Sequence, residues 1–334
     1  MLIEKDENMR IGIIGAGAIG GWIGVRLAQR GHDIAVLARG ETLAALRTHG
    51  WRLDIGGETL TARVAASDDP AALGVQDVVL ISLKGPALPA VAPRIAPMIG
   101  AETLVVPMMN GVPWWFLLGG AGDVAPTALR SVDPDGAIAA ALPYDRVIGT
   151  VVHASAAAIG PGHIMHKAGN GVIFGEPAGG SGARVARLCA MVEDAGFAVT
   201  HSDRIRYEIW YKLWGNMTMN PISAITGATC DKILDDPLVA GLTLGVMAEA
   251  QAIGARIGCP IAERGEDRMA VTRQLGAFKT SMLQDAEAGR PIEIDQLLSA
   301  PREIAATLGM ATPMLDALTG MVRLFGRQHG LYPA

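Results

Sequence analysis

A glycine-rich turn between a strand and a helix constrains the fold of this chain more than any other feature. Arg10–Ile14 is a short apolar stretch of strand type, and residues 15–20 after it read Gly-Ala-Gly-Ala-Ile-Gly. A helical pattern then runs to about Arg30, and a second apolar stretch, Ile34–Leu37, comes next. This is the strand–turn–helix–strand order in which G-x-G-x-x-G binds the pyrophosphate of a dinucleotide. We therefore predict an α/β fold that begins with a Rossmann-type domain built on a parallel sheet.

Each glycine of this turn has its own task in that prediction. Gly15 permits the tight turn, Gly17 lets the backbone approach a pyrophosphate, and Gly20 lets helix and strand pack closely. The N–H groups at the start of the helix are then available to the phosphates. The predicted cofactor-binding residues of the turn are Gly15, Ala16, Gly17, Ala18, Ile19 and Gly20.

The end of the second strand bears on which dinucleotide binds. NAD sites commonly have an acid about 20 residues after the glycines, where it holds the ribose 2′-hydroxyl. Here the strand ends in Ala38-Arg39, and an arginine can pair with a 2′-phosphate. We therefore predict NADP(H), with Arg39 as a cofactor-binding residue. Glu41 is close enough to leave NAD(H) open, and Arg39 can also be an ordinary surface cation.

Two further strand patterns end in polar residues. Asp77–Leu83 is followed by Lys84, and Leu104–Met109 is followed by Asn110-Gly111. In open α/β sheets, ligands lie beyond the carboxyl ends of the strands, so Lys84 and Asn110 are predicted to lie beside the cofactor. Asn-Gly is also a common turn dipeptide, so position rather than residue type favours Asn110.

The second half of the chain changes from strands to helices. Short antiparallel strands are predicted at 147–153 and 171–174, on either side of a Gly-Pro-Gly turn. A further strand is predicted at 197–200, and helices are predicted at 183–195, 204–220, 238–257, 268–278, 294–308 and 314–328. We predict two domains, an NADP-binding Rossmann domain over residues 9–200 and a helical substrate domain over 201–334.

Composition argues against several classes of protein. Half of the 334 residues are hydrophobic and 18% are charged, as expected for a buried parallel sheet between helices. No unbroken run of 18 uncharged apolar residues is evident, which argues against a membrane span. A net charge of −5 argues against nucleic acid as a partner.

The termini and cysteines bear on the location of the protein. The first eight residues are charged and lack the apolar stretch of a signal peptide, so we predict an extension before the first strand. Cys189, Cys230 and Cys259 are too far apart to form a metal-ligand pattern. We predict a cytoplasmic protein with reduced thiols and no metal site.

The candidate catalytic group is a polar stripe on the helix predicted over 204–220. Lys212, Asn216 and Asn220 are spaced four residues apart and so share one face of a helix. A cation and two carboxamides can hold a small oxygen-rich anion, and the lysine can also supply a proton. Pro221 disfavours the helical conformation and predicts a kink where the stripe ends. The alternative is a solvated helix face with an ordinary lysine.

A second polar group follows later in the chain. Ser281 and Glu293 are twelve residues apart, on either side of a predicted turn at Gly289, and both can face the Lys212 stripe. An N-cap role for Ser281 and a first-turn role for Glu293 are the structural alternatives.

In their order and spacing these motifs resemble the ketopantoate reductase (2-dehydropantoate 2-reductase) family over nearly the full length. The resemblance is carried by G-A-G-A-I-G at 15–20, S-L-K at 82–84, N-G at 110–111, K-L-W-G-N-M-T-M-N at 212–220, T-S-M-L-Q-D at 280–285 and E-I-D at 293–295. It implies an N-terminal Rossmann domain and a C-terminal all-helical domain like that of 6-phosphogluconate dehydrogenase. It also implies an active site in the cleft between them.

The same resemblance implies a role for each motif residue. Lys212 is the general acid on the keto oxygen, and Glu293 assists it. The residues implied to bind substrate are Asn216, Asn220 and Ser281. Asn110 is implied to lie near nicotinamide and substrate, and Lys84 on the cofactor side. The implied reaction is NADPH-dependent reduction of 2-dehydropantoate to pantoate, in pantothenate biosynthesis.

The chain departs from the family pattern after E-I-D. The family commonly continues with an aromatic residue, an aliphatic residue and Asn-Gly, whereas this chain has Gln296-Leu297-Leu298-Ser299. The change alters the wall beside Glu293 and therefore bears on the substrate.

Several alternatives stay open from the sequence. They are a reductase of another 2-oxo acid or of an opine-type substrate, and a non-catalytic NADP(H) sensor, which need not keep both Lys212 and Glu293. The oligomeric state is open as well, because the apolar helix at 238–257 fits either a core helix or the seam of a homodimer.

Overall fold

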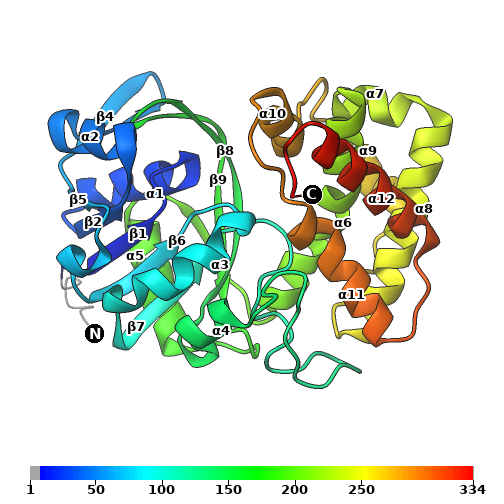
Figure 1. Ribbon diagram of the computed structural model, residues 1–334, viewed down its shortest axis with the longest axis horizontal. Coiled ribbons are helices and arrows are strands. Elements are labelled where there is room, and N and C mark those ends of the chain that lie inside the picture. Colours follow the sequence, from blue (N-terminus) through cyan, green and yellow to red (C-terminus); the bar gives the residue numbers. More distant parts are fainter. Residues whose placement is uncertain (1–7, 334) are drawn as a thin grey trace. The chain divides into compact units, whose positions relative to one another are not determined.

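The computed structural model describes residues 8–333, and the chain divides into two compact units (Figure 1). The sheet unit comprises Met1–Met109 and Ala137–Ile205, and the helical unit comprises Asn110–Gly136 and Arg206–Ala334. The predicted division between residues 200 and 201 differs from this, because residues 110–136 pack within the helical unit. Of the predicted N-terminal extension, residues 1–7 lie outside the described residues.

The sheet unit contains a parallel five-stranded sheet of order β5-β2-β1-β6-β7. Its strands are β1 (Arg10–Ile14), β2 (Asp33–Leu37), β5 (Ala65–Ser67), β6 (Gln76–Ile81) and β7 (Ile99–Pro107). The chain adds β2 and β5 on one side of β1 and then β6 and β7 on the other. The order therefore reverses at β1, and its carboxyl end is the point where ligands bind in such sheets. The predicted Rossmann-type sheet is confirmed.

The same unit contains a second five-stranded sheet, of which the sequence predicted only some of the strands. Its strands are β3 (Trp51–Ile55), β4 (Glu58–Ala62), β8 (Gly149–Gly160), β9 (His163–Gly175) and β10 (Ala198–His201). The β8–β9 hairpin turns at the predicted Gly-Pro-Gly and is antiparallel, but both strands are longer than predicted. Small residues of weak strand propensity fill 154–158, so pairing across the hairpin, rather than local propensity, extends the strands.

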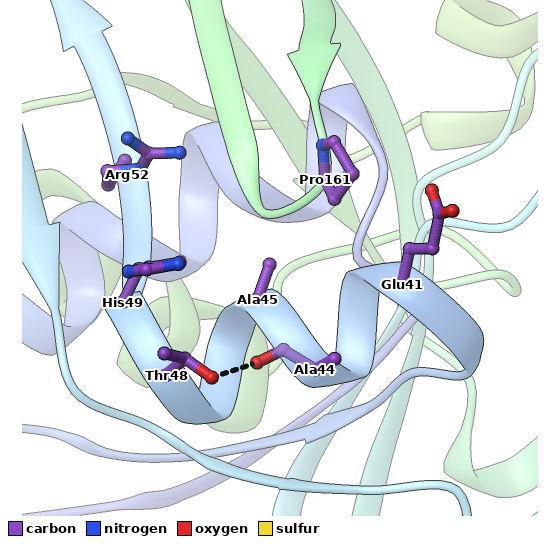
Figure 2. Close-up of a pocket in the computed structure, with 7 residues that line it drawn as sticks. All are labelled: Glu41, Ala44, Ala45, Thr48, His49, Arg52 and Pro161. Atoms are coloured by element: carbon purple, nitrogen blue, oxygen red, sulfur yellow. Dashed lines mark hydrogen bonds between the residues drawn. The ribbon is translucent and has the colours of Figure 1, made fainter.

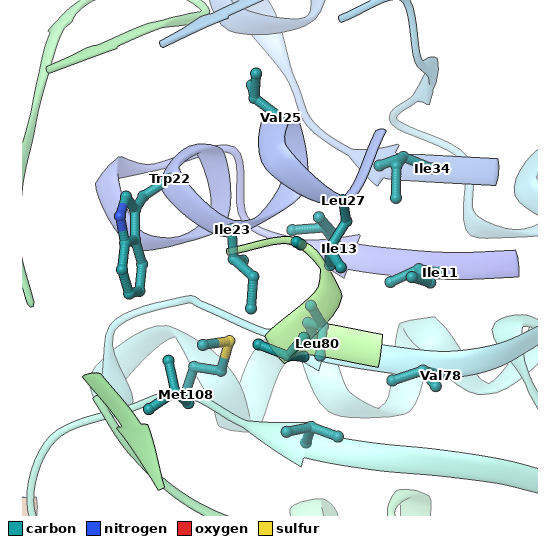
Figure 3. Packing of buried hydrophobic residues seen from close by; sticks show 14 of the residues in the cluster. Ile11, Ile13, Trp22, Ile23, Val25, Leu27, Ile34, Val78, Leu80 and Met108 are labelled. Atoms are coloured by element: carbon teal, nitrogen blue, oxygen red, sulfur yellow. The ribbon is translucent and has the colours of Figure 1, made fainter. Parts of the chain in front are cut away.

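Helix α1 (Ala18–Gln29) packs against both sheets, since it contacts β1 as well as β3, β8 and β9. Two glycines permit this close approach. A Cβ on Gly21 would stand 2.3 Å from Ile164 Cγ1, and one on Gly24 would stand 2.6 Å from Trp51 Cζ3. Trp22, Ile23 and Leu27 of the same helix are fully buried, and Figure 3 shows Ile23 and Leu27 beside residues of β1 and β6. This core holds the turn before α1 in place.

Within residues 8–333, four further α-helices belong to the sheet unit. They are α2 (Gly40–His49), α3 (Leu88–Val91), α4 (Ala137–Ala141) and α5 (Ala183–Asp194). Helix α5 packs on β9 and β10.

The helical unit is built around α6 (Ile205–Thr226) and α8 (Pro237–Arg256). The indole N–H groups of Trp210 and Trp214 donate to the carbonyls of Ala250 and Met247 on α8, at 3.1 and 2.9 Å. The other helices are α7 (Cys230–Asp235), α9 (Gly265–Arg273), α10 (Ser281–Glu287), α11 (Ala300–Thr307) and α12 (Pro313–Gln328). The pair of indole bonds fixes the rotation of α6 about its axis.

Two predicted helix ends are wrong. Helix α6 continues through Pro221 to Thr226, because burial on nearly every side outweighs the single hydrogen bond that a proline removes. Helix α9 ends at Arg273 rather than at Phe278, and Gly276 in the following turn has a φ of +62°.

Among the described residues, α8 is the one helix long and apolar enough to cross a membrane by length and composition. Glu249 in its second half accepts the N–H groups of Met314 and Leu315 at the start of α12, both at 2.9 Å. One face of α8 is buried in the helical unit, whereas Leu238 at its start is 84% exposed. The core-helix alternative therefore holds for one face of α8.

Candidate active site

The glycine-rich turn lies at the carboxyl end of β1, where the topology favours a ligand. Gly15 has a φ of +105°, and a Cβ on Gly20 would stand 2.2 Å from the Gly15 carbonyl oxygen. Apart from the two chain neighbours of Gly17, no atom of residues 8–333 lies within 4 Å of its Cβ position, so the backbone there is open to a ligand. Ser82, just beyond β6, donates from Oγ to the Gly15 carbonyl at 2.7 Å and braces the turn.

The start of α1 is free to bind an anion. Gly17 is the N-cap and offers no side chain to the first N–H groups of the helix. Those N–H groups carry the positive end of the helix dipole, and phosphates bind there readily. Ala16, Ala18 and Ile19 complete the turn and are half-buried.

Arg39 lies at the N-cap of α2, directly after Ala38. The N–H of Ala38 donates to the Ser67 carbonyl at 3.0 Å, so the carboxyl ends of β2 and β5 are adjacent. The Arg39 side chain is exposed and forms no hydrogen bond or ion pair within residues 8–333. Lys84 lies three residues past the end of β6 and is half-buried. Each is thus at the predicted edge of the sheet.

Two hollows lie on the sheet unit. One, of about 490 Å³, is lined by Asp68, Asp69, Pro70 and Arg94, and lies just past the carboxyl end of β5. The other, of about 370 Å³, lies beside α2, and Figure 2 shows Arg52 and His49 at one end and Glu41 at the other. No predicted site residue lines either hollow. Arg94, inside a short 3₁₀ segment, gave no signal in the sequence.

In the helical unit, the polar stripe lies on α6 as predicted. Lys212 and Asn216 are half-buried, and Asn220 is 5% exposed. The alternative of a fully solvated helix face is therefore wrong. The Lys212 ammonium donates to Asn110 Oδ1 at 2.8 Å, although the two residues are 102 positions apart. The sequence predicted both residues but not the bond between them.

The surroundings of Lys212 change its acidity. Burial lowers the pKa of Lys212 to about 8, and the negative charge of Glu293 opposes that shift. Glu293 is 9% exposed and, as predicted, lies close enough to Lys212 to interact electrostatically. A pKa near 8 lets a lysine give up its proton at physiological pH, which suits a general acid.

Ser281 and Glu293 do not have the structural roles that were their alternatives. Ser281 is the first residue of α10 and is exposed, while Thr280 is the N-cap, with Oγ accepting from the Leu283 N–H at 3.2 Å. Glu293 precedes the helical residues that begin at Ile294, and the first-turn acid is Asp295. Within residues 8–333, the Ser281 side chain forms no hydrogen bond, so the structure does not join it to Lys212 or Asn110.

One turn of π-helix, η5 (Asp295–Ser299), begins at the aspartate of E-I-D and contains the four residues after it. Leu298, where the family commonly has asparagine, is fully buried. Asp295 Oδ1 accepts from Ser299 Oγ at 2.9 Å and from the Tyr332 hydroxyl at 2.7 Å. Burial, together with Asp295, raises the pKa of Tyr332 to about 12. The departure from the family pattern, which begins three residues after Glu293, thus lies in buried, packed structure.

Two family models and a curated relative match this chain. Residues 11–179 match the family model Ketopantoate reductase PanE/ApbA, and residues 204–326 match Ketopantoate reductase PanE/ApbA C terminal. A 2-dehydropantoate 2-reductase of Mesorhizobium japonicum is 42% identical, over 97% of this chain and 100% of that protein.

Solved structures give the same result. A candidate ketopantoate reductase from Ralstonia solanacearum MolK2 is 55% identical with a TM-score of 0.94, over 98% of this chain and 100% of that one. The 2-dehydropantoate 2-reductase of Methylococcus capsulatus is 27% identical with a TM-score of 0.82, over 96% and 98%. The chain therefore belongs to the ketopantoate reductase family.

Proposed function

We propose that this chain is an NADPH-dependent 2-dehydropantoate 2-reductase, which converts the 2-oxo acid to the 2-hydroxy acid pantoate. The observation that carries the proposal is the Lys212–Asn110 hydrogen bond with Glu293 close by. A lysine that can give up its proton near neutral pH, hydrogen-bonded to a carboxamide, supports the role of general acid. The 42% identical relative of the same name, matched over its whole length, supports the choice of substrate.

The sheet unit has residues that fit a nicotinamide dinucleotide. The open backbone at Gly17 and the uncapped start of α1 fit its pyrophosphate. The exposed guanidinium of Arg39, at the end of β2, fits a 2′-phosphate and favours NADPH over NADH. Lys84 and Asn110 are the further cofactor-side residues. When bound, the cofactor supplies the hydride.

Lys212 would act as the general acid. It donates a proton to the carbonyl oxygen while the carbonyl carbon is reduced, and its charge stabilises the developing alkoxide. Asn110 orients the ammonium through its Oδ1, and the carboxylate of Glu293 favours the protonated lysine. The substrate carboxylate and hydroxyl would be held by Asn216, Asn220 and Ser281. The protein thus contributes alignment and charge.

A reductase for another 2-oxo acid, or for an opine-type substrate, is the second candidate function. The observation that favours it is the replacement of the family's Asn-Gly by Leu298-Ser299, of which Leu298 is fully buried five residues after Glu293. A non-catalytic sensor is less favoured, because the chain keeps Lys212 and Glu293 and brings them together.

A homodimer stays a proposal, supported by Leu238 and Leu324, which are 84% and 61% exposed. A cytoplasmic location stays a prediction.

The test is the decay of NADPH absorbance with a panel of 2-oxo acids that includes 2-dehydropantoate. We expect the highest kcat/KM for 2-dehydropantoate. A higher value for another acid would establish the second candidate instead. NADPH binding without turnover of any acid in the panel would favour the sensor.

A further inference from the structure

The π-turn η5 changes the hydrogen bonding of the helix that follows Glu293. The N–H of Ala300 donates to the Asp295 carbonyl, five residues earlier, rather than to the Gln296 carbonyl, four residues earlier. Pro301 comes next and has no N–H. Single π-turns of this kind inside helices often mark functional sites.

The Gln296 carbonyl is consequently left without a donor in its own helix. In α-helical register its donor would be Ala300, which already serves Asp295. In π-helical register its donor would be residue 301, which is the proline. Gln296 is 3% exposed, so a vacant carbonyl there would be costly. The Val112 N–H fills the vacancy and donates to the Gln296 carbonyl at 2.8 Å.

This bond holds the segment that carries Asn110. Gly111 has a φ of +80°, and a Cβ there would stand 2.5 Å from the Gln296 carbonyl oxygen, so only glycine permits the contact. Asn110 comes directly before Gly111 and accepts from the Lys212 ammonium. A continuous set of contacts therefore leads from the π-turn to the proposed general acid.

We propose that Pro301 is a positioning residue for the reductase reaction. Pro301 removes the π-register donor to the Gln296 carbonyl, while the α-register donor, Ala300, serves Asp295, so that carbonyl remains available to Val112, which sets Asn110 against Lys212. The inference rests on the proposed function, in which Asn110 and Lys212 belong to the active site. Pro301 itself acts only through the backbone and contacts no reacting atom.

The variant Pro301→Ala tests this directly. An alanine supplies an N–H at 301, so in the π-register of η5 the Gln296 carbonyl gains a donor from its own helix that competes with Val112. Hydrogen exchange at the Val112 amide should become about tenfold faster, because the amide loses its acceptor. The kcat should fall roughly three- to tenfold, while KM for the 2-oxo acid changes less. The Tm should not fall, because alanine is the better helix former.

A double variant distinguishes an effect of Pro301 on the position of Asn110 from a general destabilisation of the helical unit. In an Asn110→Ala background, Pro301→Ala should lower kcat no further, because the contact through which it acts is already gone. Pro313→Ala is the matched control. It removes a first-turn proline from α12 in the same unit, and should leave Val112 exchange and kcat unchanged.

Unchanged exchange at Val112 in Pro301→Ala would overturn the proposal. So would an equal fall in kcat with and without Asn110. If Pro301→Ala does not fold, Pro301→Ser restores the same N–H and carries the same test. Failure of the chain to reduce any 2-oxo acid would refute the proposed function alone, since exchange at Val112 is measured without substrate.

Discussion

The sheet unit offers a ligand the backbone of one continuous turn, whereas the helical unit offers side chains from segments far apart in the sequence. In the turn at 15–20, the proposed binding depends on the lack of side-chain atoms, because Gly17 leaves the approach open and Gly20 leaves room for packing. In the helical unit, Asn110 and Lys212 meet across 102 residues. A backbone site needs only local conformation, while a site of side chains needs the whole unit to be folded.

The two sites also differ in how charge is used. The start of α1 provides partial positive charge from N–H groups that do not titrate. The protonated Lys212 side chain provides a full positive charge, and burial lowers its pKa to about 8. We therefore expect the chemistry to depend on pH through the helical unit and the cofactor affinity to depend on the sheet unit.

The largest expected effect is on kcat, and it tests whether catalysis depends on the helical unit. Lys212→Ala should lower kcat by about 10²–10⁴, the usual range for a positioned general acid, and leave NADPH affinity nearly unchanged. Stopped-flow kinetics and fluorescence titration of NADPH measure the two quantities. Lys232→Ala, an exposed lysine of α7, is the matched control. Near-wild-type turnover in Lys212→Ala would remove the stripe on α6 from the mechanism.

The pH dependence of kcat sharpens the same test. Because the acid must carry its proton, kcat should fall as pH rises through about 8, where buried Lys212 deprotonates. That alkaline limb should be absent from the residual activity of Lys212→Ala. A limb that persists there would belong to another group.

The second largest expected effect is on NADPH affinity and concerns Arg39 of the sheet unit. Arg39→Ala should weaken NADPH about ten- to hundredfold and leave NADH affinity nearly unchanged, because only NADPH has the 2′-phosphate. Isothermal titration measures both affinities. Arg30→Ala, an exposed arginine at the other end of the sheet, is the control. Equal affinity of the wild type for the two cofactors would refute the role of Arg39.

The smallest effect tests whether the backbone turn is a binding site or only a structural one. Gly17→Ala should weaken NADPH binding on the order of tenfold without lowering Tm, since no more distant residue of the described chain lies within 4 Å of the new Cβ. Gly20→Ala should instead destabilise the fold by about 1–3 kcal/mol, since its Cβ meets the Gly15 carbonyl. Similar melting losses in both would show that the turn is purely structural.

From the sequence alone, the turn at 15–20, the parallel sheet and the polar stripe on α6 were predictable. Each follows from a local rule: glycine at a positive φ for Gly15, buried apolar runs for the strands, and a spacing of four for the helix face. The residue types of the candidate site were accessible for the same reason. Such rules depend on near neighbours in the chain.

Tertiary structure decided the rest. Residues 110–136 pack in the helical unit, Asn110 accepts a hydrogen bond from Lys212, and α6 continues through Pro221. Thr280 rather than Ser281 is the cap of α10. Tertiary structure also set the pKa of Lys212, because desolvation depends on what packs around the ammonium. These features arise from contacts between distant segments, whose energies no local pattern contains.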